Sequence, residues 1–115
     1  MQTAKAFEVN EQNFDGEVLE SPQPVLVVFW EDSCYPCRAM DTVLDQLAER
    51  YEGRVRIAHI DAQASWQTAR NYDIRNLPTA LLFQQGRVTE TIVGVEPGTV
   101  FEKALDEVLA GDWVI

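Results

Sequence analysis

Apolar and polar positions follow two different periods along this 115-residue chain, and the periods predict where strands and helices form. Short apolar or alternating runs predict strands over residues 6–9, 25–30, 54–61, 79–84 and 88–93. The run over 25–30 is apolar throughout and rich in β-branched residues, which is typical of a central strand buried on both faces. Gln85-Gly86 separates the last two runs and predicts a hairpin turn.

Apolar residues spaced three and four apart predict helices over residues 10–19, from Cys34 to about 51, 65–72 and from about 98 to 110. Asn10 and Ser65 are suited to cap the first and third helices, and Gly53 and Gly111 are placed to end the second and fourth. The order of elements is βαβαβαββα. It predicts an α/β domain with a central mixed sheet flanked by helices on both faces.

Length and composition indicate one globular domain over residues 1–115, with 46% hydrophobic and 24% charged residues. Nine basic and 19 acidic residues give a net charge of −10, which disfavours nucleic acid as a partner. No run approaches the ~20 apolar residues that span a bilayer. Residues 1–10 lack the pattern of a signal peptide. We therefore expect no membrane association and a cytoplasmic protein.

The segment Cys34-Tyr35-Pro36-Cys37 carries the candidate chemistry. A helix that follows the strand ending at Trp30 places Cys34 at its N-terminus, where unpaired N–H groups and the helix dipole favour a thiolate. Cys37 lies one turn further on, in the same apolar stripe as Met40, and should be less exposed. We therefore expect Cys34 to attack a disulfide and Cys37 to resolve the mixed disulfide. Pro36 fits the first helical turn, where its missing N–H costs nothing.

Other readings of the two cysteines are weaker. A closed zinc site needs about four ligands, and this chain has two cysteines and one histidine, so we expect no metal. Two cysteines are also too few for a disulfide-dense secreted scaffold. A pair of incidental core cysteines stays an alternative.

Several further segments carry a resemblance to a known family. They are Phe29-Trp30, Cys34-Tyr35-Pro36-Cys37-Arg38, Asp61, Tyr72-Asp73-Ile74-Arg75-Asn76-Leu77-Pro78-Thr79, Phe83 and Gly94. With these residues the chain resembles the thioredoxin family over nearly its whole length. The resemblance implies the thioredoxin fold, with Pro78 as a cis proline that faces the disulfide.

The resemblance also implies a substrate-binding surface beside the cysteines. The backbone of Leu77 would pair with an extended substrate segment, and Gly94 would lie beside the same groove. Trp30 would pack beside the cysteines, with Tyr35 and Pro36 at the rim. Plainer readings stay open for three of these residues: a turn glycine at 94, a core tryptophan at 30 and a tolerated exposed side chain at 35.

The implied function is protein thiol–disulfide exchange that reduces disulfides in cytosolic client proteins. A thioredoxin reductase or another electron donor would regenerate the dithiol, no bound cofactor is needed, and we expect a monomer. One alternative is a disulfide isomerase or oxidase with a higher potential. Another is a thioredoxin-like binding module or co-chaperone with weak redox activity, which the apolar tail Trp113-Val114-Ile115 favours if that tail contacts a partner instead of the core.

The sequence departs from the family pattern next to the cysteines. Tyr35 replaces a glycine and should narrow access to Cys34, while Ser33 replaces a tryptophan and offers a hydroxyl for helix capping. Val28 stands where the family has a buried aspartate, and His59 stands at its lysine partner. We hypothesise that His59 takes over proton transfer for Cys37, directly or through water; a histidine without a role is the alternative.

Overall fold

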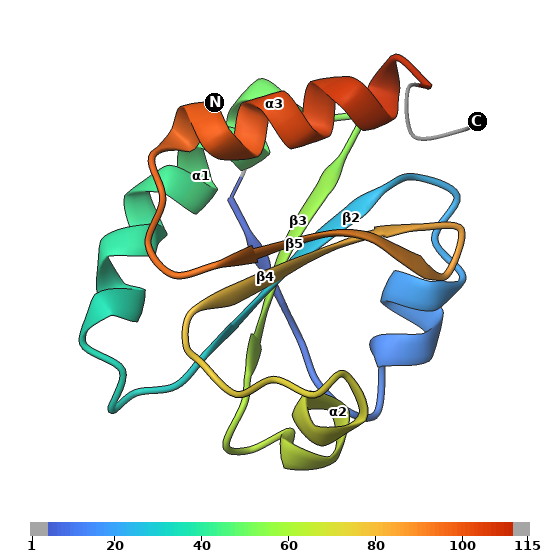
Figure 1. Ribbon diagram of the computed structural model, residues 1–115. Coiled ribbons are helices and arrows are strands. Elements are labelled where there is room, and N and C mark those ends of the chain that lie inside the picture. The colour runs from blue at the N-terminus through green and yellow to red at the C-terminus, as the bar shows by residue number, and fades with distance from the viewer. Residues whose placement is uncertain (1–4, 112–115) are drawn as a thin grey trace.

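A five-stranded mixed sheet forms the centre of the computed structural model, which describes residues 5–111 (Figure 1). Its strands are β1 (Phe7–Val9), β2 (Val25–Trp30), β3 (Arg56–Asp61), β4 (Thr79–Gln84) and β5 (Arg87–Val93). They lie in the order β1-β3-β2-β4-β5. β1 and β2 run parallel to β3, whereas β4 runs antiparallel to both β2 and β5. The central position of β2 explains its unbroken apolar run.

Helices cover both faces of this sheet, and their order confirms the predicted βαβαβαββα arrangement. They are the π-helical turn η1 (Asp15–Leu19), the 3-10 turn η2 (Pro36–Ala39), α1 (Met40–Arg50), α2 (Trp66–Asn71) and α3 (Gly98–Leu109). Figure 1 shows α1 and α3 on one face, with α2 and η1 on the other. Among the described residues, no helix is long and apolar enough to cross a membrane.

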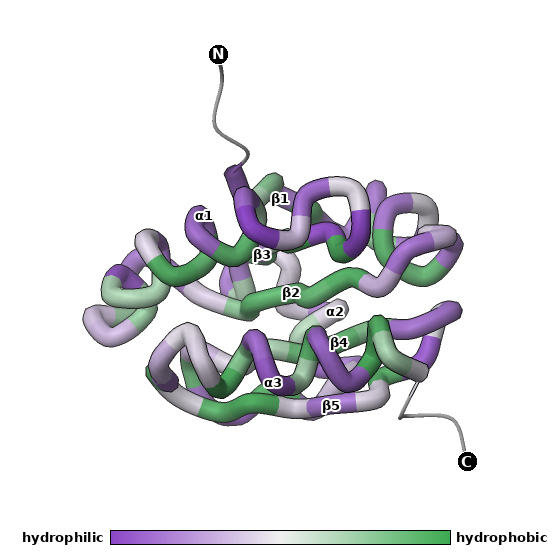
Figure 2. The backbone as a smooth tube through the Cα atoms, turned by 90° about the horizontal axis from the view of Figure 1, so that it is seen from above, coloured by the Kyte–Doolittle hydropathy of each residue, from purple (hydrophilic) through white to green (hydrophobic). Residues whose placement is uncertain are grey.

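The core is divided by the sheet into two clusters of buried side chains. Leu26 and Val28 of β2 point toward α1 and α3 and pack in one cluster with Leu44 and Phe101. Alternate β2 residues, such as Phe29, belong to the other cluster with η1 and α2. β2 is therefore apolar, and Figure 2 shows most of its length in green. This packing on both faces holds the end of β2 rigidly beneath the loop that follows it.

Tyr51 joins the two helices of the first face at the end of α1. Its hydroxyl donates a hydrogen bond of 2.7 Å to Oδ1 of Asp106 in α3, and the residue is 1% exposed. Burial and then the hydrogen bond to the Asp106 carboxylate raise the pKa of Tyr51 to about 12. The folded protein therefore holds the phenol proton more tightly than the unfolded chain does.

Several details of the predicted helices are wrong. The helix expected from Cys34 begins as the 3-10 turn η2, and α1 proper starts only at Met40. Ser65 stands at the N-cap of α2 but makes no capping hydrogen bond through its side chain. Oδ1 of Asp61 accepts the N–H groups of the two residues at 63 and 64 instead, because this carboxylate already projects from the end of β3.

Two other terminal features were also predicted. Asn10 does not cap the first helix as predicted, because η1 begins only at Asp15 and Phe14 stands at its N-cap. Oδ1 of Asn10 instead accepts the N–H groups of Gln12 and Asn13 in the turn that precedes η1. The apolar tail Trp113-Val114-Ile115 lies outside the described residues.

Candidate active site

The two cysteines lie in the segment that follows β2, at the carboxyl end of the central strand. Cys34 and Cys37 form a disulfide with a Cα–Cα distance of 5.3 Å. The backbone N–H of Cys37 donates a hydrogen bond of 3.2 Å to Sγ of Cys34. Both residues are largely covered, with Cys34 9% and Cys37 5% exposed. A backbone donor aimed at the Cys34 sulfur favours negative charge on that atom, which is the chemical requirement for an attacking thiolate.

The segment before β4 lies beside the cysteines because of the sheet register. Phe29 pairs with Thr79, so the residues just before Thr79 lie next to the end of β2. The Leu77–Pro78 peptide bond is cis, in agreement with the family resemblance. Among the described residues, the backbone N–H and C=O of Leu77 have no hydrogen-bond partner. An unpaired peptide group of this kind is a template for an added strand.

Gly94 closes the same side of the site. Its N–H donates to the carbonyl of Pro78 at 2.8 Å, which fixes the start of the loop after β5. Its φ is +89°, a conformation that favours glycine, and a Cβ built here would contact nothing within 4 Å. The glycine is therefore required by the backbone rather than by a close neighbour within the chain. The open space beside it leaves room for an approaching peptide.

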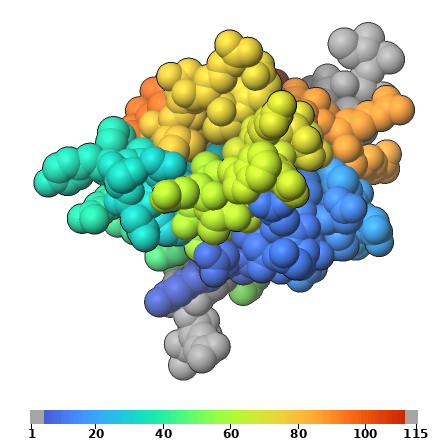
Figure 3. All heavy atoms as spheres, turned by 90° about the horizontal axis from the view of Figure 1, so that it is seen from below, coloured from blue at the N-terminus to red at the C-terminus, as the bar shows by residue number. Residues whose placement is uncertain are grey.

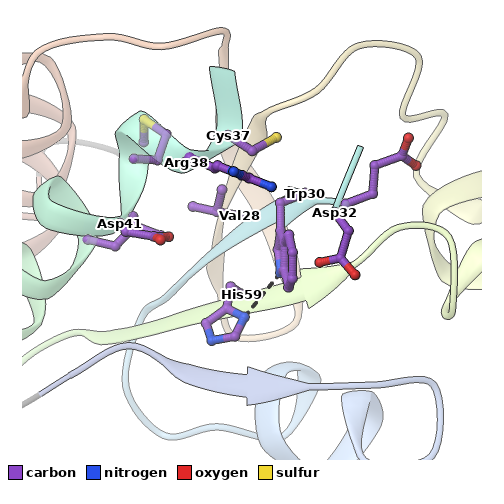
Figure 4. Close-up of a pocket in the computed structure, with 10 residues that line it drawn as sticks. Val28, Trp30, Asp32, Cys37, Arg38, Asp41 and His59 are labelled. Carbon is purple, nitrogen blue, oxygen red and sulfur yellow. Dashed lines mark hydrogen bonds between the residues drawn. The ribbon is translucent and has the colours of Figure 1, made fainter. Parts of the chain in front are cut away.

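Trp30 and His59 form a pair below the cysteines. The indole N–H of Trp30 donates a hydrogen bond of 3.1 Å to Nδ1 of His59, and their ring centroids lie 5.9 Å apart (Figure 4). His59 lies directly opposite Val28 in the parallel pairing of β2 with β3. Val28 itself is 1% exposed and packs in the apolar core. The two positions where the family has a buried ion pair therefore hold an apolar residue and an imidazole.

A cavity of about 460 Å³ connects this pair to the buried cysteine. Its lining includes Cys37, His59 and Trp30, with the carboxylates of Asp32 and Asp41 nearby (Figure 4). Water molecules can enter a space of this size and link the polar groups within its mostly apolar lining. Within residues 5–111, no three His, Cys, Asp or Glu residues are grouped so that they could hold a metal ion.

The rim of the site differs from the sequence prediction only at Ser33. Tyr35 is 81% exposed, and the guanidinium of Arg38 lies 5.9 Å from its ring centroid. Pro36 occupies the first turn of η2, as predicted. The hydroxyl of Ser33 donates to Oε1 of Glu31 at 2.6 Å and caps no helix. The Ser33 hydroxyl binds the Glu31 carboxylate because this group lies only two residues away and is a strong, charged acceptor.

A second hollow, of about 380 Å³, lies between Leu77 and α2, and the sequence prediction missed it. The apolar spacing that predicts a helix over 65–72 groups Trp66 with Ala69 and Tyr72, but Trp66 is 53% exposed and lines this hollow. Helix α2 has six residues, too few for one stripe to decide which side chains are buried. Arg70 could have indicated that Trp66 is exposed, because it lies four residues after Trp66, and a charged residue on the same helix face favours a face in contact with water.

Comparisons with known proteins agree with this architecture. The family model "Thioredoxin" matches residues 5–107. "Thioredoxin 1" of Nostoc sp. is 36% identical over 102 residues, which cover 89% of this chain and 95% of that protein. "Thioredoxin" of Chlorobaculum thiosulfatiphilum is 39% identical over 103 residues, covering 90% of this chain and 95% of the relative. "Thioredoxin M5, chloroplastic" of Oryza sativa subsp. japonica is 39% identical over 98 residues, which cover 85% of this chain and 57% of the relative.

Proposed function

This chain belongs to the thioredoxin family and is a thiol–disulfide oxidoreductase, and we propose that within this activity Cys34 is the nucleophile and Cys37 the resolving residue. The observation that carries the assignment is the hydrogen bond from the Cys37 N–H to Sγ of Cys34. The same interaction in the reduced protein stabilises the Cys34 thiolate relative to the thiol. No comparable donor reaches the sulfur of Cys37 among the described residues.

The reaction proceeds in two exchanges. The Cys34 thiolate attacks one sulfur of a client disulfide, so that a Cys34–client disulfide forms and the other client sulfur leaves as a thiolate. Cys37 then loses its proton and attacks Sγ of Cys34. This second step forms the Cys34–Cys37 disulfide and releases the client's remaining sulfur, so that two electrons have passed to the client. The structure has the oxidised product of this sequence.

Client segments bind, in this proposal, along the surface formed by Leu77, Pro78 and Gly94. The unpaired peptide group of Leu77 supports it, because an extended chain can hydrogen-bond there and reach the cysteines. Trp30, Tyr35 and Pro36 complete the rim. Their burial ranges from the half-buried indole to the exposed phenol of Tyr35, which offers an aromatic contact to the client.

His59 accepts the proton of Cys37, in this proposal, through water in the cavity that both residues line. A neutral imidazole has one nitrogen lone pair, and the hydrogen bond from Trp30 occupies it at Nδ1. His59 can therefore take up a proton only when that hydrogen bond opens. Trp30 is a positioning residue in this scheme, because it fixes the ring and competes for the same lone pair.

Membership of the family implies client proteins that contain disulfides and a donor that restores the dithiol. We propose a thioredoxin reductase as that donor and a monomer as the active form. We also propose a cytoplasmic setting, where reducing conditions favour net reduction of clients. Because some relatives carry chloroplastic in their names, the setting is best tested directly by fractionation of the source cells.

Reduction of insulin disulfides tests the proposal. The natural protein should accelerate insulin reduction by dithiothreitol, and also by a thioredoxin reductase with its own electron source. Cys34→Ser should abolish both rates while the protein stays folded. If natural protein and variant are equally inactive but both still capture a partner, the binding-module alternative is correct. If the natural protein oxidises or rearranges disulfides instead of reducing them, the oxidase or isomerase alternative is correct.

A further inference from the structure

The hollow between Leu77 and helix α2, which we call the α2 groove, adjoins the surface proposed for client binding. Leu77 belongs to both, because it lines the groove and has the unpaired peptide group beside the cysteines. Figure 3 shows the face on which the turquoise segment around the cysteines, the yellow-green α2 and the yellow segment after it meet. A client chain that pairs with Leu77 and continues toward α2 would cross the groove.

The groove combines an exposed aromatic side chain with an unpaired cation. Trp66 is 53% exposed, a large apolar area to leave in water. Two carboxylates also line the groove, and both have partners: Asp73 pairs with Arg75 at 2.9 Å, and Glu31 accepts the Ser33 hydroxyl at 2.6 Å. By contrast, Arg70 has no carboxylate within 4.0 Å among the residues that the structure describes. The free guanidinium therefore lies on the same helix face as the exposed indole.

We propose that the α2 groove selects client segments that present a carboxylate to Arg70 and an apolar side chain to Trp66. The inference rests on the proposed function and adds a substrate class to it. Charge complementarity carries the argument, because a net charge of −10 disfavours acidic partners overall. An unpaired arginine beside the path of the client can form an ion pair with one client carboxylate, although the net charge of the protein disfavours acidic partners.

Three peptides that share one disulfide test the proposal. They carry Leu-Glu, Leu-Gln or Leu-Lys on the flank of the reacting cysteine, and the dipeptide is moved along the flank to find the position that reaches the groove. Pre-reduced protein is mixed with each peptide, and the second-order rate constant is measured after acid quenching. We expect the natural protein to prefer the Glu peptide to the Lys peptide by about two- to fivefold, the range typical of an exposed ion pair.

Charge reversal at Arg70 should invert this preference. Arg70→Glu should slow the Glu peptide and speed the Lys peptide, with no change for a small disulfide such as hydroxyethyl disulfide. Arg87→Glu is the matched control, because it changes the net charge equally. Arg87 pairs with Gln84, at the end of the sheet away from Trp30. Trp66→Ala should slow all three peptides by about two- to tenfold, and Trp66→Phe should restore most of the rate.

Two results would overturn the inference while leaving the proposed function intact. One is an equal change for all three peptides in Arg70→Glu, and the other is the same inversion in Arg87→Glu. If the natural protein reduces none of the peptides and no small disulfide, the proposed function is wrong, and this inference falls with it.

Discussion

Replacement of Trp30 by phenylalanine tests whether the Trp30–His59 hydrogen bond slows proton transfer by occupying the lone pair of His59. Trp30→Phe keeps an aromatic ring beside the cavity but removes the N–H that donates to Nδ1 of His59. If His59 accepts the proton of Cys37, the lone pair of the imidazole becomes available without the cost of opening that bond. We therefore expect the resolving step to become faster in the variant, which is an unusual result for a substitution beside an active site.

The expected increase in the rate of the resolving step follows from the free energy of the hydrogen bond that is lost. A protein hydrogen bond contributes about 0.5–1.5 kcal/mol net. At 25 °C this corresponds to a factor of about 2 to 12 in a rate limited by access to the lone pair. The bond of 3.1 Å is of ordinary length, and both rings are partly buried, so we expect a value inside this range.

Stopped-flow reaction of the reduced protein with a chromogenic aromatic disulfide measures the step. Cys34 attacks first and releases one coloured thiolate, and Cys37 then releases the second, so that two phases are seen. Trp30→Phe should accelerate the second phase from about pH 6 to about pH 8 and leave the first unchanged. His59→Ala should slow the second phase.

A double-mutant cycle decides whether Trp30 acts through His59. In the His59→Ala background, Trp30→Phe should no longer change the second phase, because no lone pair remains to be released. The reasoning is refuted if Trp30→Phe leaves the second phase unchanged or slows it. It is refuted equally if the acceleration persists without His59.

Three further variants test the roles of single residues. Cys37→Ser should trap the client as a stable mixed disulfide, seen as a one-to-one adduct on a non-reducing gel and released by dithiothreitol. Tyr51→Phe should cost about 1 kcal/mol of unfolding free energy at neutral pH, since its hydroxyl loses Asp106. The pKa of Tyr51 is raised to about 12, so the stability that its protonated hydroxyl contributes is complete below about pH 10 and is lost as the pH rises toward 12. Denaturation at about pH 8 and about pH 11 should show this loss in the natural protein and not in the variant. Gly94→Ala should cost about 1–2 kcal/mol through backbone strain alone, whereas Gly16→Ala, where φ is not positive and space is also open, should be neutral or stabilising in the same denaturation assay.

The strands were predicted well because burial on two faces leaves a strong pattern. The bounds of β2 and β4 agree with the predicted runs, and the order of elements follows directly. The start of α1 was harder to predict, since a 3-10 turn and an α-helix place apolar residues at similar spacing over a few residues. Trp66 was misplaced because a six-residue helix contains too few positions to define a buried side.

The candidate site was predictable where neighbours in sequence are neighbours in space. The cysteines, Pro36 and the cis Pro78 are of this kind. The hydrogen bond between Trp30 and His59 joins residues 29 positions apart, and it depends on the register of β2 against β3. Strand alternation alone predicts that His59 shares a face with Val55 and Ile57, and His59 does line a cavity beside Val28, which belongs to the same cluster as those residues. It carried no information on which side chain would accept or donate.

The absence of the buried aspartate and the presence of His59 both follow from the cost of burying an unpaired charge. Position 28 is 1% exposed and lies in the cluster with Met40 and Leu44, where an unpaired carboxylate would cost several kcal/mol. That cost is a large part of the about 5–15 kcal/mol by which a typical domain is stable. An imidazole opposite Val28 needs no permanent charge, because it is neutral until a proton reaches it. In the proposed mechanism the proton-accepting group has therefore moved from β2 to β3, and its hydrogen-bond partner is an indole N–H that must be released before the proton is accepted.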